Sequence, residues 1–170
     1  MISKDIMFDI EGGRFNYRVG AIIIDSGEIL MTKNSDTPFY YTVGGRVRMG
    51  ESAEEAVIRE AFEETQILLE IDRLAYVHEN FFVLESDGNF YHEISLFFLM
   101  KPSPALREAE LVSFTEEGYG DIELHWLPIS SLGGLRAYPD FLKDELPDIS
   151  KGIKHFVTKG GVTMPRGCNP

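Results

Sequence analysis

The stretch Gly45–Ile67, which reads GRVRMGESAEEAVIREAFEETQI, gives the clearest indication of both fold and function in this chain. Glu60, Glu63 and Glu64 are three and four positions apart, so on a helix their side chains share one face. Like charges at this spacing destabilise a helix by roughly 0.2–0.5 kcal/mol per pair. Glu51 adds another carboxylate just ahead of the helix. A divalent cation among the oxygens would offset the repulsion, so the pattern indicates a metal site rather than a solvated acidic face.

The same stretch predicts where a helix begins and how it packs. Ser52 is a favourable N-cap, and Glu55 three residues later completes a capping box, so a helix is predicted from here to about Leu68. Two apolar pairs with i,i+4 spacing flank the glutamates, namely Val57 with Ala61 and Ile58 with Phe62. Apolar residues on both flanks predict a helix packed between layers, with its carboxylates facing a cleft.

The composition is typical of one globular domain. The 170 residues are 44% apolar and 26% charged, and we expect a single domain over 1–170, with a core at about 17–146 and a C-terminal tail at 151–170. The net charge is −12, from 28 acidic and 16 basic residues, which disfavours a protein that binds nucleic acid or anionic membranes. Because we find neither a long apolar run nor a signal peptide, the expected location is the cytoplasm.

Alternating and β-branched stretches predict strands on both sides of this helix. The predicted strands are 17–24, 28–32, 39–43, 74–84, 90–100 and 123–128. Turn residues at 25–27 and 86–88 predict two hairpins. Loops are predicted at 33–38 and 101–120, and short helices at 130–132 and 139–146. This order of elements predicts an α+β domain or a layered α/β/α sandwich.

The spacing of the glycine, arginine and glutamates resembles the signature of the Nudix hydrolases, a family that includes MutT-like pyrophosphohydrolases. The matching positions are Gly45, Glu51, Arg59, Glu60, Ala61, Glu63, Glu64 and Ile67. One position departs, because the family's glycine near the helix end is Gln66 here. Either the helix continues to about Leu69, or Gln66 adopts a left-handed backbone at a cost of roughly 1–2 kcal/mol. The resemblance implies the Nudix fold, a mixed sheet with the signature as a loop–helix–loop.

The resemblance also implies a reaction, the hydrolysis of a nucleoside diphosphate linked to another group, with Mg²⁺ or Mn²⁺ as cofactor. Hard cations of this kind bind carboxylate oxygens and neutralise phosphate charge. The implied metal ligands are Glu60, Glu63 and Glu64, with Glu51 bound through a water or as an outer ligand. Arg59 is expected to pair with Glu51 and to fix the loop against the helix. The predicted catalytic residues are Glu63, Glu64, Arg59 and Glu117.

The general base and the substrate contacts are less closely defined. The base is open among the signature carboxylates, Glu116 or Glu117 in the predicted loop, and Glu93 in the strand at 90–100. Phosphate contacts are predicted for Gly45, Arg46 and Arg48. Recognition of the base or of the leaving group is predicted for the aromatic residues Tyr40, Phe81, Phe82 and Tyr138. Tyr138 begins a Tyr-Pro-Asp segment similar to one that holds the base in some oxidised-purine nucleotide hydrolases, although a helix N-terminus with proline in its first turn explains it equally well.

The leading function hypothesis is a Mg²⁺-dependent hydrolase that cleaves the pyrophosphate bond of a nucleoside di- or triphosphate. Within the enzyme class, the alternative is an ADP-ribose or nucleotide-sugar pyrophosphatase. From another class, the alternative is a non-catalytic nucleotide-binding regulator with the same fold. Such a regulator would be expected to lose signature carboxylates, and this chain keeps them. The expected partner is a small-molecule nucleotide, and a homodimer is left open.

Overall fold

The computed structural model describes residues 5–34, 38–84, 88–108, 114–116, 120–149 and 152–160. Its strands are β1 Met7–Ile10, β2 Gly13–Ile22, β3 Ile24–Asp25, β4 Glu28–Asn34, β5 Tyr40–Arg46, β6 Ile71–Val83, β7 Phe90–Met100, β8 Phe114–Glu116, β9 Gly120–Pro128, β10 Ala137–Tyr138 and β11 Lys154–Lys159. Its helices are α1 Ala53–Thr65, α2 Pro104–Glu108 and α3 Leu142–Glu145, with 3-10 helices η1 Ile129–Gly134 and η2 Leu146–Asp148.

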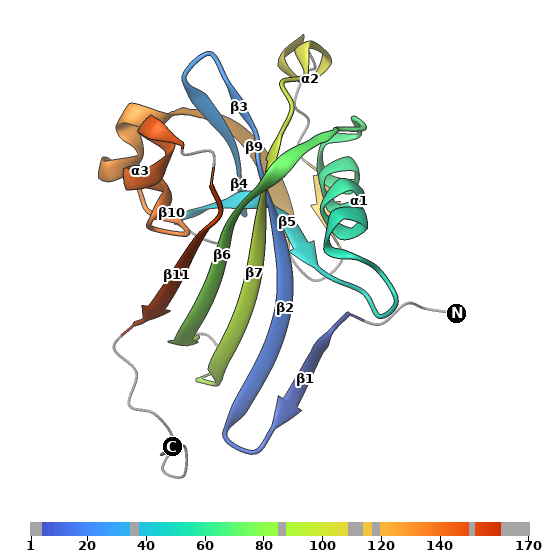
Figure 1. The fold of residues 1–170 in the computed structure, drawn as a ribbon, viewed down its shortest axis with the longest axis vertical. Helices are drawn as coiled ribbons and strands as arrows, with labels where there is room; N and C mark the ends of the chain where they lie inside the picture. The colour runs from blue at the N-terminus through green and yellow to red at the C-terminus, as the bar shows by residue number, and fades with distance from the viewer. Residues whose placement is uncertain are drawn as a thin grey trace.

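These eleven strands of the described residues form one mixed sheet (Figure 1). The order is β11-β6-β7-β2-β5-β4-β9-β8, and β1, β10 and β3 pair with β2, β5 and β4 respectively. The pairs β2–β7, β5–β10 and β6–β11 are parallel, and the other pairs are antiparallel. The mixed sheet that the family resemblance implies is therefore confirmed.

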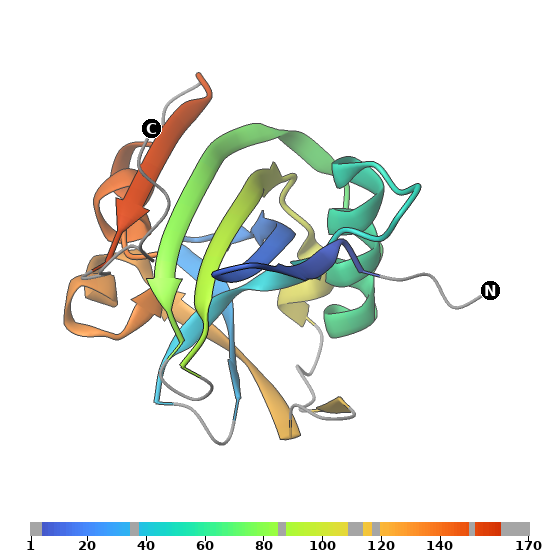
Figure 2. The same cartoon turned by 90° about the horizontal axis from the view of Figure 1, so that it is seen from below.

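Helices cover both faces of the sheet. Figures 1 and 2 show α1 on one side, and α3 with η1 on the other. Side chains alternate between two cores: in β7, Phe98 packs in the core that includes α1, whereas Phe97 packs with Leu142 of α3. The predicted layered α/β/α sandwich is confirmed. None of the helices in the described ranges has the length and apolar character that crossing a membrane requires.

Helix α1 begins where the sequence predicts and ends earlier. The Ser52 side chain accepts a hydrogen bond from the Glu55 amide (3.2 Å), and the Glu55 carboxylate accepts one from the Ser52 amide (2.8 Å). The helix ends at Thr65 because Gln66 has φ 59° and ψ 16°, a left-handed backbone. The longer predicted helix is therefore wrong. Phe62 is 44% exposed, so the predicted packing of both apolar flanks is also wrong.

Both predicted hairpins are present with adjusted ends. β6 and β7 pair antiparallel, although Ser86 and Asp87 of their predicted turn lie outside the described residues. The predicted strand at 17–24 is divided, because β2 pairs with β7 and β5 whereas the short β3 pairs with β4. Ser26 and Gly27 have φ of 52° and 79°, the two positive values that a tight two-residue hairpin turn requires.

Four other segments differ from the prediction. The loop predicted at 101–120 contains α2 and β8. The helix predicted at 139–146 is shorter, since α3 begins at Leu142 and passes into η2. The C-terminal tail contains β11, which pairs in parallel with β6. β1 adds a strand beside β2 that the sequence pattern did not indicate.

Candidate active site

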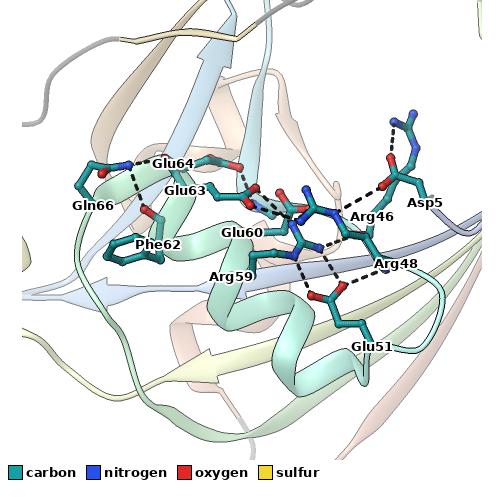
Figure 3. A network of polar contacts seen from close by, with 11 residues as sticks. Asp5, Arg46, Arg48, Glu51, Arg59, Glu60, Phe62, Glu63, Glu64 and Gln66 are labelled. Atoms are coloured by element: carbon teal, nitrogen blue, oxygen red, sulfur yellow. Dashed lines mark hydrogen bonds and ion pairs between the residues drawn. The ribbon is translucent and has the colours of Figure 1, made fainter. Parts of the chain in front are cut away.

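Helix α1 packs on β5, and Figure 3 shows its glutamates Glu60, Glu63 and Glu64 on the side that carries Arg59. The Gly44 amide donates a hydrogen bond to Glu64 Oε1 (3.0 Å), and the other carboxylate oxygen of Glu64 is buried. The Glu60 carboxylate fills the space where a side chain on Gly45 would lie, so any larger residue would overlap it. Gly45 therefore lies against Glu60, and the physical reason is the absence of a Cβ.

Arg59 joins the loop to the helix through five hydrogen bonds. Its Nε and Nη2 donate to the two oxygens of Glu51 at 2.7 and 2.9 Å, which is a bidentate pair. Nη1 donates to Glu60 Oε1 (2.7 Å) and Glu63 Oε2 (3.2 Å), and Nη2 also donates to the Arg46 carbonyl (3.0 Å). The expected pair of Arg59 with Glu51 is present, and the same guanidinium brings three carboxylates together.

Charge and burial act in opposite directions on these carboxyl groups. The hydrogen bonds from Arg59 lower the pKa of Glu51, which also accepts from the Arg48 amide (2.9 Å). Burial raises the pKa of Glu60, whose side chain is only 16% exposed, and the hydrogen bond from Arg59 opposes this rise. The contact with Glu51 in turn raises the pKa of Arg59. The guanidinium therefore stays charged and neutralises part of the acidic cluster.

The two loop arginines lie at the edge of this cluster. Arg48 Nη1 is 3.6 Å from Glu63 Oε1, and its Nε is 3.9 Å from Asp5. Arg46 Nη1 is 3.7 Å from the other oxygen of Asp5. Glu63 is 46% exposed, so its carboxylate is open to solvent beside Arg48. Positive charge is thus available next to the exposed side of the glutamates.

Arg18 is a site residue that the sequence reasoning missed. It lies in β2 directly opposite Arg46 in the β2–β5 register, and its Nε is 3.9 Å from Glu93 Oε2. Its charge acts to lower the pKa of Glu60. A signal was available, because Arg14, Asn16 and Arg18 are polar residues at alternating positions of β2.

Tyr138 lies apart from the glutamates, in an aromatic group on β5 and β10. Tyr138 pairs with Tyr41 in the β5–β10 register, and both rings are about two-fifths exposed. The Phe39 ring lies 4.9 Å from Tyr41 and 5.7 Å from Tyr138, edge to face. Tyr41 and Gly45 are four residues apart and on one face of β5, which is roughly 13 Å along the strand.

The other predicted residues are further from this centre or cannot be placed. Tyr40 packs on the α3 side of the sheet, and Phe81 and Phe82 lie near the hairpin end of β6. Glu117 lies outside the described residues. Glu116 is in β8, of which the structure describes the backbone. The catalytic role of Glu117 therefore stays a prediction.

The sequence profile of the NUDIX domain matches residues 14–147, which is most of the chain. The chain belongs to the NUDIX family. Among solved structures, this NUDIX chain resembles a MutT protein from Methanosarcina mazei Go1, with 25% identity, a TM-score of 0.59, and coverage of 80% of this chain and 92% of that one. Members of the family generally use a divalent metal.

Two curated relatives match a shorter part of the NUDIX chain. A putative 8-oxo-dGTP diphosphatase from Bacillus subtilis (strain 168) is 50% identical over 52 residues, which is 29% of this chain and 35% of the relative. A MutT-like protein from Streptomyces ambofaciens is 33% identical over 61 residues, 36% of this chain and 40% of the relative. The chain thus matches well under half the length of these two relatives.

Proposed function

We propose that this NUDIX protein is a divalent-metal-dependent hydrolase that cleaves the pyrophosphate bond of a nucleoside di- or triphosphate or a related nucleotide. The observation that carries the proposal is the packing of the α1 carboxylates against Gly44 and Gly45, with Arg59 holding the preceding loop to the same helix. This arrangement gathers acidic oxygens on one side of a helix, beside the C-terminal end of β5. The MutT-like names of the relatives support the same class of reaction.

The donors fit Mg²⁺ or Mn²⁺ in their chemistry. Among the described residues, no three acidic, histidine or cysteine side chains converge into a finished cation site. Instead, Nη1 of Arg59 lies between Glu60 and Glu63 and bonds to both. Carboxylate oxygens are the ligands that hard cations prefer, so we assign Glu60, Glu63 and Glu64 as ligands and Glu51 as an outer ligand. When bound, a cation of this kind neutralises phosphate charge and lowers the pKa of a bound water.

Arg18, Arg46 and Arg48 are assigned to the phosphates. A protein of net charge −12 repels a polyphosphate unless local positive charge faces it. Arg18 and Arg46 are opposite each other on adjacent strands, so two guanidinium groups meet there, with Glu93 3.9 Å from Arg18 and Asp5 3.7 Å from Arg46. Arg48 lies beside the exposed Glu63. Their guanidinium groups are suited to phosphate oxygens.

The aromatic group supports a nucleotide rather than inorganic polyphosphate as substrate. Tyr41 lies on the same face of β5 as Gly45, at roughly 13 Å along the strand. This separation suits a diphosphate bound at Gly45 and a ring of an attached group bound at Tyr41. Tyr41 and Tyr138 expose their rings, and exposed rings bind bases by stacking. We therefore assign Tyr138, with Tyr41, to a ring of the leaving group on one side of the diphosphate.

A substrate panel with product analysis tests the proposal. Purified protein is incubated with nucleoside triphosphates, nucleoside diphosphates, ADP-ribose and nucleotide sugars, with Mg²⁺, Mn²⁺ or EDTA. Phosphate-containing products are identified by mass spectrometry, which locates the cleaved bond. The expected result is hydrolysis of at least one nucleotide that stops in EDTA and returns with added metal. Nucleotide binding without turnover on the whole panel would instead favour the non-catalytic regulator.

A further inference from the structure

A patch of polar side chains lies on the α3 side of the sheet, where a core would be expected. The strand register places these residues in two adjacent rows across β6, β7 and β2, namely His78–Ser95–Arg18 and Asn80–Glu93–Asn16. Successive rows are two residues apart, so all six side chains are on one face. The next row contains Tyr76 and Phe97, which belong to the apolar core under α3. We call these six residues the polar rows.

The polar rows are rich in hydrogen-bond acceptors, with Asn16, His78 and Ser95 buried and the other three residues partly exposed. Asn16 and Ser95 are each only 3% exposed, and the Glu93 side chain is 15% exposed. Asn16 Nδ2 donates to Glu93 Oε2 (3.3 Å), and Ser95 Oγ donates to Glu93 Oε1 (3.2 Å). Asn16 Oδ1 is buried and has no hydrogen-bond partner among the described residues. A buried amide oxygen without a donor is unfavourable, so a donor from outside the chain is expected there.

The polar rows are continuous with the proposed phosphate site. Arg18 belongs to one of them, lies 3.9 Å from Glu93, and is the register partner of Arg46. Its charge also acts on Glu60 in the acidic cluster. A molecule whose phosphates contact Arg18 would therefore have its next chemical group beside Glu93 and Asn16.

We propose that Asn16 and Glu93 bind hydrogen-bond donors of the nucleoside, while Arg18 contacts the adjoining phosphate. The inference rests on the proposed function, because it takes the ligand to be a nucleotide. A free amide oxygen next to a carboxylate accepts hydrogen bonds and has little to donate, so the complementary ligand presents N–H or O–H groups. Two parts of a nucleoside do so: a base with neighbouring amino and ring N–H groups, and the ribose hydroxyls. A polar site of this kind discriminates strongly against an analogue that lacks the donor.

Calorimetric binding of uncleavable analogues tests this inference separately from catalysis. The full chain with Mg²⁺ is titrated with the α,β-methylene diphosphates of guanosine, inosine and 2′-deoxyguanosine, and with methylenediphosphonate, which has no nucleoside. The wild-type protein is compared with Glu93→Gln and Asn16→Leu. The matched control is Glu79→Gln, a carboxylate of β6 that is on the other face of the sheet and bonds to His155. Thermal unfolding checks each variant, and the nearly isosteric Glu93→Gln carries the test if Asn16→Leu does not fold.

The expected result is a loss of at least tenfold in affinity for the best nucleoside analogue in Glu93→Gln and Asn16→Leu, with methylenediphosphonate and the control variant unchanged. If the wild type prefers the guanosine analogue over the inosine analogue and Glu93→Gln does not, the bound donors belong to the base. If the wild type prefers the guanosine analogue over the 2′-deoxyguanosine analogue and Glu93→Gln does not, the bound donors belong to the ribose. Equal losses for methylenediphosphonate, unchanged binding of all analogues, or a crystal structure with only water at Asn16 Oδ1 would overturn the inference. Nucleoside-dependent binding without hydrolysis of the cleavable panel would refute the proposed function and leave the inference standing.

Discussion

Glu64 is the carboxylate whose position depends most on the backbone of β5. One oxygen accepts from the Gly44 amide and the other is buried, so the side chain is held in one orientation. Glu64→Gln keeps the shape and an oxygen for Gly44 but removes the charge. We expect a loss of at least about a hundredfold in kcat with Mg²⁺, at unchanged thermal stability.

The control for this variant is Glu54→Gln, which changes an exposed acid in the first turn of the same helix. Steady-state hydrolysis of the best nucleotide, with circular dichroism for folding, measures both variants. Wild-type turnover in Glu64→Gln would show that this carboxylate has no part in the reaction.

Residues near one another in sequence could be predicted to meet, and residues on separate strands could not. Glu51 and Arg59 are eight positions apart in a loop–helix segment, and the family signature implied their pairing correctly. Arg18 has no local signal that links it to Arg46, because their proximity depends on the register of β2 with β5. Glu93 was considered only as a base, since its contact with Asn16 depends on the β2–β7 register.

At the scale of elements, the stability of the C-terminal end of α1 depends on the left-handed backbone of Gln66. Its Nε2 donates to the carbonyls of Phe62 (3.3 Å) and Glu63 (2.9 Å), so the side chain caps the helix while its φ of 59° costs energy. Gln66→Gly removes the backbone cost and the exposed hydrogen bonds, and we expect a gain of up to about 1 kcal/mol in unfolding free energy. Gln66→Ala keeps the cost of the left-handed backbone and loses the side-chain hydrogen bonds. Its free energy of unfolding should therefore be about 0.5–1 kcal/mol lower than that of the wild type. Urea denaturation that ranks alanine above glycine would refute this account.

β11 is an element that lies beyond the region matched by the NUDIX profile, and it packs on α3. The Phe156 ring stacks on Phe141, with centroids 4.2 Å apart and planes 7° apart. Phe156→Ala should lower the free energy of unfolding by about 2 kcal/mol, because both stacking and apolar burial are lost. Val157→Ala is the control: it changes the neighbouring residue, which is 53% exposed, and should stay within about 0.5 kcal/mol. Equal effects in chemical denaturation would mean that β11 does not contribute to the α3-side core.

Elements with strong local patterns were predictable, and elements that depend on distant partners were not. The capping box at Ser52 and Glu55 located the start of α1, and the long apolar runs located β6 and β7. β10 and β11 pair with strands far from them in sequence, β5 and β6, whereas β1 pairs with β2 directly after it. All three have six residues or fewer, too few for a clear alternation of polar and apolar side chains.

At the scale of the whole molecule, His78 of β6 lies where the polar rows meet the C-terminal strand β11. His78 is 5% exposed, its Nε2 lies 2.9 Å from Thr158 Oγ1 of β11, and its ring contacts Phe141 of the α3 side. Burial lowers the pKa of His78 below its ordinary 6.5, with Glu93 opposing the change and His155 adding to it. The neutral ring is thus part of the packing that joins β6, β11 and α3.

The lowered pKa of His78 fixes the sign of a pH effect on folding. The unfolded chain binds a proton at His78 at a higher pH than the folded protein does, so stability rises with pH in that interval. The stabilisation is complete above about pH 6.5 and is lost as the pH falls toward the lower folded pKa.

We expect the unfolding free energy to decline between about pH 7.5 and pH 5, and to decline less in His78→Gln. A His78→Gln curve parallel to wild type in urea titrations at several pH values would show that this buried ring does not couple protonation to folding.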